Sequence, residues 1–139
     1  MTTTRPEFDT ELFKKGAAIR REVLGANFVK KSDAANVDDL MVPLRKLITE
    51  SCWGDVWSRP GLDRKTRSFV NLGMLIGLNR PHELRLHLRG AINNGITVAE
   101  IQEVILQSAI YCGAPAALDA MKAAREIIAE MKQERNASS

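Results

Sequence analysis

The stretch that decides the fold is NRPHELRLHLRGAINNG, residues 79–95. Its apolar residues recur at intervals of three and four, the period of an α-helix that buries one face. Pro81 suits the first turn of such a helix, and Gly95 suits the position just past its end. We therefore expect a helix that begins at Pro81 and ends before Gly95. The apolar stripe consists of Leu84, Leu88, Ala91 and Ile92.

A second set of residues follows the edge of this stripe at i, i+4, i+7 and i+11. They are Glu83, His87, Gly90 and Asn94. Glu83 and His87 stand one helical turn apart, so the two side chains can form a hydrogen bond. That bond would fix the imidazole tautomer and raise the pKa of His87, whereas partial burial would lower it. Such a pair is also common as a simple boundary contact, so spacing alone leaves a catalytic and a structural interpretation open.

Helical patterns continue on both sides, and strand alternation is almost absent. Asp9 or Thr10 caps a helix that ends near Leu24, and residues 26–37 are expected to form a connection. Asp63 caps a helix to about Leu78, and Thr97 opens a capping box. The other expected elements are a helix over residues 38–52, an ordered loop or short irregular helix over 51–62, and helices over 97–111 and 115–133. The sequence thus predicts one all-α domain over residues 1–139, a bundle of about six helices with polar termini at about 1–9 and 134–139.

Composition narrows the class of protein. Hydrophobic residues make up 45% and charged residues 27%, the balance of a globular domain that builds its own core. The net charge is +3 without any run of five like charges, so we expect no nucleic-acid partner. The longest apolar stretch, residues 72–78, is too short for a membrane span, and the polar N-terminus lacks the pattern of a signal peptide. We therefore expect a cytoplasmic protein with no membrane partner.

The residues that bind metals or perform thiol chemistry are sparse. Cys52 and Cys112 are isolated, and we expect both to be reduced and structural. His82, Glu83 and His87 are residue types that bind zinc, but their spacing does not suit one shared ion. The two histidines are five positions apart and point about 140° from each other on a helix. The sequence therefore predicts no metal.

Arginines and tryptophans cluster before the predicted third helix. Arg59, Arg64 and Arg67 carry planar guanidinium groups, which bind carboxylates through two parallel hydrogen bonds. Arg64 and Arg67 are equally compatible with a solvated helix face. Trp57, like Trp53, is either an anchor of the core or a platform for a substrate. These residues favour a site for a small anion and leave its details open.

Several motifs of the chain are similar to one enzyme family. They are WGDVWSRPGLDRKTR at 53–67, the stretch at 79–95 quoted above, TVAEIQEV at 97–104 and YCGAPAA at 111–117. Together they resemble the 4-carboxymuconolactone decarboxylases of protocatechuate catabolism, over roughly residues 13–130. The resemblance implies the all-helical fold of the alkylhydroperoxidase D proteins and a homo-oligomer, a trimer or hexamer.

The resemblance also implies a reaction. The expected substrate is a small anionic lactone, 4-carboxymuconolactone, which loses CO2 to give the 3-oxoadipate enol-lactone without any cofactor. His87 would donate the proton and Glu83 would orient it. Arg59, with Arg64 or Arg67, would bind the substrate carboxylates beside Trp57. Asn94 would donate a hydrogen bond to the lactone oxygen.

Three alternatives remain. The alkylhydroperoxidase D branch contains peroxidases that use a CxxC followed four residues later by histidine. Aligned on His87, this chain has Arg80 and Glu83 at the cysteine positions and Ser68 near the relay acid, which disfavours a disulfide-cycling peroxidase. The second alternative is a decarboxylase or isomerase of a related lactone. The third is a non-catalytic assembly protein with the same fold.

Overall fold

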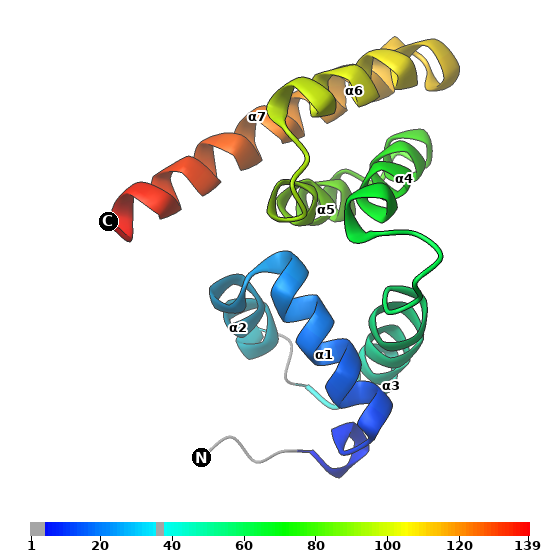
Figure 1. Ribbon diagram of the computed structural model, residues 1–139, viewed down its shortest axis with the longest axis vertical. Coiled ribbons are helices and arrows are strands. Elements are labelled where there is room, and N and C mark those ends of the chain that lie inside the picture. Colours follow the sequence, from blue (N-terminus) through cyan, green and yellow to red (C-terminus); the bar gives the residue numbers. More distant parts are fainter. Residues whose placement is uncertain (1–4, 36–37) are drawn as a thin grey trace. The chain divides into compact units, whose positions relative to one another are not determined.

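The computed structural model describes residues 5–35 and 38–139, and within these residues the chain is helical and contains no strand. The prediction of an all-α protein is confirmed. The chain divides into two compact units, Met1–Leu62 and Asp63–Ser139, and each is described by itself below (Figure 1). The expected single domain stays a prediction.

The first unit is built around one long helix. It contains the 3-10 turn η1 (Pro6–Phe8), α1 (Glu11–Leu24), α2 (Ala26–Ala35), α3 (Val42–Leu47) and the π-helix η2 (Ile48–Val56). Thr10 caps α1 by accepting a hydrogen bond from the backbone N–H of Phe13 at 3.0 Å, and Gly25 ends it, as predicted. Phe13, Val23 and Leu24 are buried, so α1 presents its apolar face to the rest of the unit.

Two glycines let α1 and η2 approach each other closely. A Cβ added at Gly16 would lie 2.0 Å from the carbonyl oxygen of Thr49, and one added at Gly54 would lie 2.7 Å from that of Leu12. Both obstacles are backbone atoms, which cannot move aside as a side chain can. The backbones therefore touch at this crossing, and a side chain at either position would force them apart.

Two predictions for this unit were wrong. Residues 26–35 form α2 where we expected a connection, because this helix buries only Val29 and so shows little apolar periodicity. Asp33 holds this helix in place through ion pairs of 2.8 Å with Arg20 of α1 and Arg45 of α3. The helix expected over residues 38–52 begins only at Val42 and widens at Ile48 into η2, which ends at Val56. Asn36 and Val37 lie outside the described residues.

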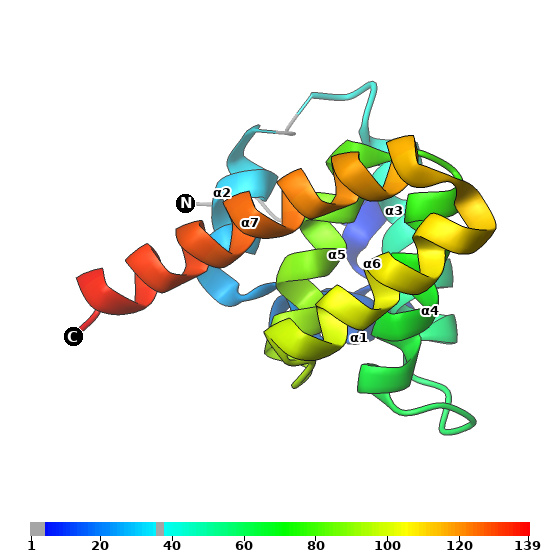
Figure 2. The same ribbon diagram turned by 90° about the horizontal axis from the view of Figure 1, so that it is seen from above.

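The second unit is a bundle of α4 (Arg64–Gly77), α5 (Pro81–Asn93), α6 (Val98–Cys112) and α7 (Ala114–Ala137). Asp63 caps α4, and the Thr97 capping box opens α6, as predicted. Helices α6 and α7 lie side by side and run in opposite directions, and α5 packs against both α4 and α7 (Figure 2). The last helix continues to Ala137 through the tail that we expected to be frayed.

The core of the second unit comes from all four helices. Helix α5 contributes Leu84, Leu88 and Ala91, which are at most 3% exposed. These are three of the four residues of the predicted apolar stripe, and the fourth, Ile92, is partly buried against the same core. The apolar stretch at residues 72–78 is only partly in this core, because Leu72 and Ile76 are buried whereas Met74 and Leu78 are exposed. The remaining core residues are Ile96, Ile101, Ile105, Ala117, Ala120, Ala123, Ala124 and Ile127.

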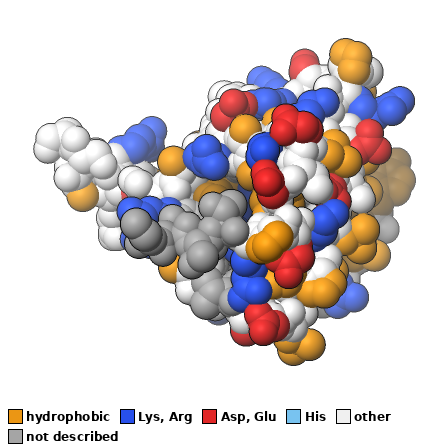
Figure 3. Space-filling model, turned by 90° about the horizontal axis from the view of Figure 1, so that it is seen from below, with side chains coloured by type: hydrophobic (Ala, Val, Ile, Leu, Met, Phe, Trp, Pro, Cys, Tyr) orange, Lys and Arg blue, Asp and Glu red, His pale blue; other side chains and the backbone are white. Residues whose placement is uncertain are grey.

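The surface carries mixed charge. On the face drawn in Figure 3, Lys and Arg side chains lie among Asp and Glu side chains and scattered apolar ones. Such interspersed charges are typical of a solvated surface. Among the described residues, no helix combines the length and the apolar character that crossing a bilayer requires.

The crossing of α1 and η2 leads to a stability prediction. We expect Gly16→Ala to destabilise the protein by about 1–3 kcal/mol, because its Cβ overlaps backbone that cannot move aside. The matched control is Gly73→Ala in α4, where an added Cβ meets nothing within 4 Å. Alanine favours a helix over glycine, so the control should stabilise by about 0.5–1 kcal/mol. Urea denaturation measures both changes, and a harmless Gly16→Ala would contradict the prediction.

Candidate active site

His87 lies in the middle of α5, on the side that faces α4. Its ring is half-buried, and its Nδ1 lies 3.2 Å from Nδ2 of Asn71 on α4. An amide nitrogen has only hydrogens to offer, so Nδ1 is the acceptor in this pair and the ring proton of the neutral form sits on Nε2. The contact fixes the orientation of the imidazole, and the amide as it is placed favours the neutral tautomer with its proton on Nε2.

The surroundings of His87 favour the uncharged ring. Burial lowers the pKa of His87 below its ordinary value of 6.5, and the negative charge of Glu83 opposes this shift without cancelling it. The two opposing directions agree with the expectation, but Glu83 raises the pKa through its charge, and the predicted hydrogen bond between Glu83 and His87 stays a prediction. Burial prevails, so at neutral pH the resting ring is an imidazole rather than an imidazolium.

Glu83 lies one turn before His87 and is exposed. It acts on the ring through its charge. The partner that the structure gives to Nδ1 is Asn71, so the tautomer is set from the neighbouring helix α4. Glu83 sits in the first turn of α5, where the helix dipole also favours a carboxylate.

Asn94, at the C-terminal end of α5, joins the same two helices. Its Nδ2 donates to Oγ of Ser68 at 2.9 Å and to the carbonyl oxygen of Arg64 at 3.4 Å. Ser68 is only 1% exposed, so this contact is shielded from water. The amide nitrogen of Asn94 thus has two acceptors within the protein, and its role toward a substrate stays a prediction.

Arg64 and Arg67 lie in the first two turns of α4 and are both half-buried. Arg67 precedes Asn71 by four residues and Arg64 precedes it by seven, so all three share one side of the helix. That side is the one that contacts α5 through Asn71 and Ser68. The structure therefore places two guanidinium-bearing residues on the same helix face as the partner of His87.

Trp57 and Arg59 belong to the first unit. Trp57 is buried and its ring centre lies 5.0 Å from that of Trp53, so within its unit it acts as an anchor at the end of η2. Arg59 is exposed in the loop that follows. The structure brings His87, Glu83, Asn94, Arg64 and Arg67 into one unit, and the substrate roles of Trp57 and Arg59 stay predictions.

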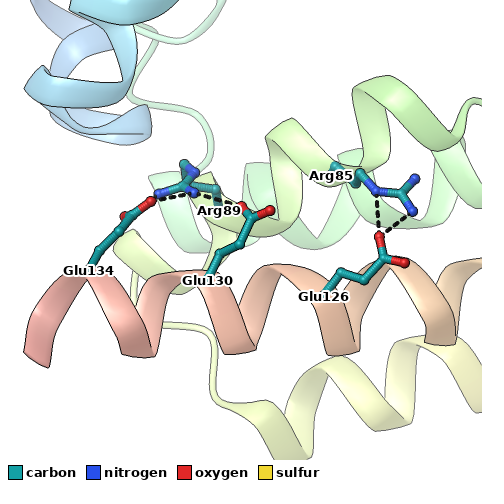
Figure 4. A network of polar contacts seen from close by, with 5 residues as sticks. All are labelled: Arg85, Arg89, Glu126, Glu130 and Glu134. Carbon is teal, nitrogen blue, oxygen red and sulfur yellow. Dashed lines mark hydrogen bonds and ion pairs between the residues drawn. The ribbon is translucent and has the colours of Figure 1, made fainter.

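On the side of α5 away from His87, arginines attach the helix to α7 (Figure 4). Arg89 is 5% exposed, and its two terminal nitrogens contact both carboxylate oxygens of Glu134 at 2.7 and 3.0 Å. One of them also reaches Glu130 at 3.3 Å. One turn earlier, Arg85 binds Glu126 with its Nε at 3.1 Å. Helix α5 is thus held from two sides, by polar groups of α4 and by carboxylates of α7.

The cysteines are free and differ in exposure. Burial raises the pKa of the Cys52 thiol, which makes it a poor nucleophile at neutral pH. Cys112 is exposed, and its expected structural role stays a prediction. Among the described residues, no three His, Cys, Asp or Glu side chains converge in a way that would hold a metal ion.

Sequence reasoning missed Asn71 and the anchoring role of Ser68. A signal was available, because Arg64, Ser68 and Asn71 follow one another at i, i+4 and i+7 along the helix. Polar residues at that spacing share a face. The apolar run at residues 72–78 is a more conspicuous pattern, and it lies in the second half of the same helix.

A groove of about 750 Å³ opens elsewhere in the second unit, between α4 and α6. Phe69 and Gly73 form one wall, and the side chains of α6 from Ala99 to Cys112 form the other. The residues that line it do not include His87 or its partners. We therefore place the candidate active site at the α4–α5 contact rather than in this groove.

Comparison with known proteins identifies the family of the chain. The sequence model of the carboxymuconolactone decarboxylase family matches residues 43–126, more than half of the chain. A nitrosuccinic acid decarboxylase of Metarhizium robertsii is 45% identical over 128 residues, which cover 92% of this chain and 89% of the relative. A 4-carboxymuconolactone decarboxylase of Acinetobacter baylyi is 42% identical over 123 residues, covering 88% and 91%.

A third relative, an uncharacterised 15.0 kDa protein of Paracoccus denitrificans, is 31% identical over 73% of the chain and 78% of its own length. The chain belongs to the carboxymuconolactone decarboxylase family, which confirms the resemblance. Both relatives with a named activity are decarboxylases, and this chain is an enzyme of the same class, a carboxy-lyase.

The attachment of α5 to α7 leads to a second stability prediction. We expect Glu134→Ala to lower Tm by about 4 °C or more, because it leaves the buried Arg89 charge without its two-bond partner. The matched control is Glu126→Ala. Its partner Arg85 is 35% exposed and can be hydrated instead, so this variant should lower Tm much less. Equal shifts in a thermal melt would contradict the distinction.

Proposed function

We propose that this carboxy-lyase removes CO2 from 4-carboxymuconolactone and gives the 3-oxoadipate enol-lactone, as a step of protocatechuate catabolism. The observation that carries the proposal is the oriented, half-buried His87 on the α4–α5 contact, with Nδ1 bound to Asn71. The similarity to the Acinetobacter enzyme along 88% of the chain supports the choice of substrate.

The proposed reaction needs few groups from the protein. The departing carboxylate sits on the ring carbon γ to the lactone carbonyl. When its C–C bond breaks, the electron pair moves through the ring double bond into the carbonyl and gives a dienolate. A proton added at the carbon α to the carbonyl leaves a double bond between the β and γ carbons. The substrate is its own electron sink, so the proposal requires no cofactor.

His87 is the proton donor in this scheme. The resting ring is neutral, so it must first gain a proton to become an acid. A bound substrate brings two carboxylates close to the ring, and nearby negative charge raises the pKa of an imidazole. Binding and protonation thus favour each other. The Nε2–H of the imidazolium then passes to the α carbon of the dienolate, and the ring recovers a proton from solvent.

Charged and polar neighbours complete the proposed site. Glu83 stabilises the imidazolium by its charge. Arg64 and Arg67, on the α4 face that carries Asn71, are proposed to bind a substrate carboxylate, together with Arg59 and Trp57 from the first unit. Arginine suits this task because its planar group forms two parallel bonds to a carboxylate. For Asn94 the contacts to Ser68 and Arg64 support a positioning task more than donation to the lactone oxygen.

A second candidate substrate is nitrosuccinic acid, the substrate after which the Metarhizium relative is named. The 45% identity over 92% of this chain favours it. Its departing carboxylate sits on a carbon that bears a nitro group, and the nitro group accepts the electron pair as a nitronate. Both substrates are small dicarboxylates with a built-in electron acceptor. The same proton donor and the same arginines would serve either.

We also propose that the enzyme acts in the cytoplasm as a homo-oligomer, with neither a nucleic acid nor a membrane as partner. The exposed apolar side chains of the second unit support self-association, because exposed apolar clusters of this kind commonly mark interfaces. One of them, Tyr111, lines the groove between α4 and α6. The most exposed are Leu78, Ile110, Tyr111 and Leu118, which are 66–83% exposed.

The substrate and the proton donor are tested together. Purified protein is given 4-carboxymuconolactone or nitrosuccinic acid, and CO2 release is followed. We expect turnover of the lactone, and His87→Gln should lower kcat by roughly 10²–10⁴, the usual contribution of a general acid. His82→Gln is the matched control, since His82 is exposed on the same helix and is the only other histidine. Lactone turnover unaffected by His87→Gln would refute the proton-donor role, and exclusive turnover of nitrosuccinic acid would select the second substrate.

The pKa of His87 predicts a pH dependence. The active acid is the imidazolium, so kcat/KM should fall as pH rises through the pKa of the free protein, which lies below 6.5. The fall of kcat should come at higher pH, because bound carboxylates raise the pKa in the complex. Glu83→Gln should move the fall of kcat/KM to still lower pH, whereas Glu103→Gln on α6 should not. Coincident profiles for kcat and kcat/KM would contradict the coupling.

A further inference from the structure

The bond between Asn71 and His87 has properties that a simple helix contact does not require. A carboxamide carries a donor at one end and an acceptor at the other, and rotation by 180° about its Cβ–Cγ bond exchanges them. A neutral imidazole that accepts at Nδ1 needs the amide nitrogen. An imidazolium, which donates at Nδ1, needs the amide oxygen. Asn71 can supply either atom at the observed 3.2 Å without moving α4 or α5.

We infer that Asn71 is the positioning residue of His87, serving both of its protonation states and thereby reserving Nε2 as the nitrogen that delivers the proton. The inference rests on the proposed role of His87 as proton donor. In the resting protein the amide N–H of Asn71 donates to Nδ1. When the ring takes up a proton at Nδ1, the amide rotates and its oxygen accepts that N–H. The Nε2 proton then leaves to the substrate carbon, and Nε2 is reprotonated by solvent.

The helices around the site hold this pair in place. Asn94 ties the end of α5 to Ser68, one turn before Asn71 on α4. Arg89 and Arg85 tie the opposite side of α5 to carboxylates of α7. With both helices held, the rotation of the amide requires no movement of either helix.

Other charges near the ring have separate tasks. Glu83 precedes it on α5, while Arg64 and Arg67 share the α4 face of Asn71. The carboxylates of α7 that approach α5, those of Glu126, Glu130 and Glu134, are bound to Arg85 and Arg89. None of these charged groups can exchange a donor for an acceptor, as the amide of Asn71 can.

Two variants at position 71 distinguish a positioning residue from one that only fills space. Asn71→Asp keeps the shape and offers acceptor atoms alone. It should therefore stabilise the imidazolium, raise the pKa of His87 and move the neutral proton from Nε2 to Nδ1. Asn71→Leu keeps a similar volume and offers neither atom. It should lower kcat by about 10- to 100-fold with KM little changed, because the ring loses its fixed orientation.

The experiment is 15N NMR of the imidazole rings in the full chain without substrate. The protein has two histidines, so exposed His82 serves as an internal reference. We expect neutral wild-type His87 to carry its proton on Nε2, and Asn71→Asp to move it to Nδ1 with a higher titration midpoint. Asn79→Asp adds the same charge at an exposed site beyond the end of α4 and should change neither property.

The outcomes separate this inference from the proposed function. A wild-type ring protonated on Nδ1, or an Asn71→Asp variant that titrates like Asn79→Asp, would overturn the role of Asn71 whatever the substrate is. Absence of lactone and nitrosuccinate turnover in the wild type would overturn the proposed function and leave the NMR result intact. If Asn71→Asp fails to fold, the wild-type tautomer and the kcat of Asn71→Leu still decide the inference.

Discussion

The second unit depends on how firmly α5 is held, because this helix carries both the apolar stripe of the core and the imidazole of His87. Its stripe buries Leu84, Leu88 and Ala91 almost completely. Hydrophobic burial is strong but has no direction, so it fixes depth rather than rotation about the helix axis. The rotation is fixed by directional contacts, from Asn94 to Ser68 on α4 and from Arg89 to Glu134 on α7.

Placing a functional ring at the edge of a core has an electrostatic consequence. The packing that orients His87 also removes it from water, and burial then favours its neutral form. A neutral imidazole is a poor acid. In the proposed scheme, the negative charge of a bound substrate raises the pKa of His87 again, and the proposed substrates bring two carboxylates. At neutral pH the imidazolium would then form mainly in the complex, next to the carbon that is to be protonated.

Sequence patterns predicted most of the helices and one side of the site. Pro81, Asp63 and Thr97 mark helix starts through local backbone chemistry, which a single sequence displays directly. Helix α2 was not predicted, because it buries only Val29 and is held by ion pairs of Asp33 with distant arginines. The role of Asn71 was not predicted for a related reason. Its partner is 16 residues away on another helix, and helical periodicity identifies faces without saying which faces meet.

The spacing of Glu83 and His87 suggested a dyad contained within one helix, and the structure extends it to a second helix. An i, i+4 pair on one helix forms whenever that helix forms, whereas a bond between α4 and α5 exists only when the two helices are packed. The imidazole is therefore oriented by tertiary structure, and its tautomer is defined only in the folded bundle. Because Asn71 takes Nδ1, Glu83 is left to act through its charge. In the proposed mechanism, the carboxylate of Glu83 supplies charge, the amide of Asn71 supplies orientation and the imidazole of His87 transfers the proton.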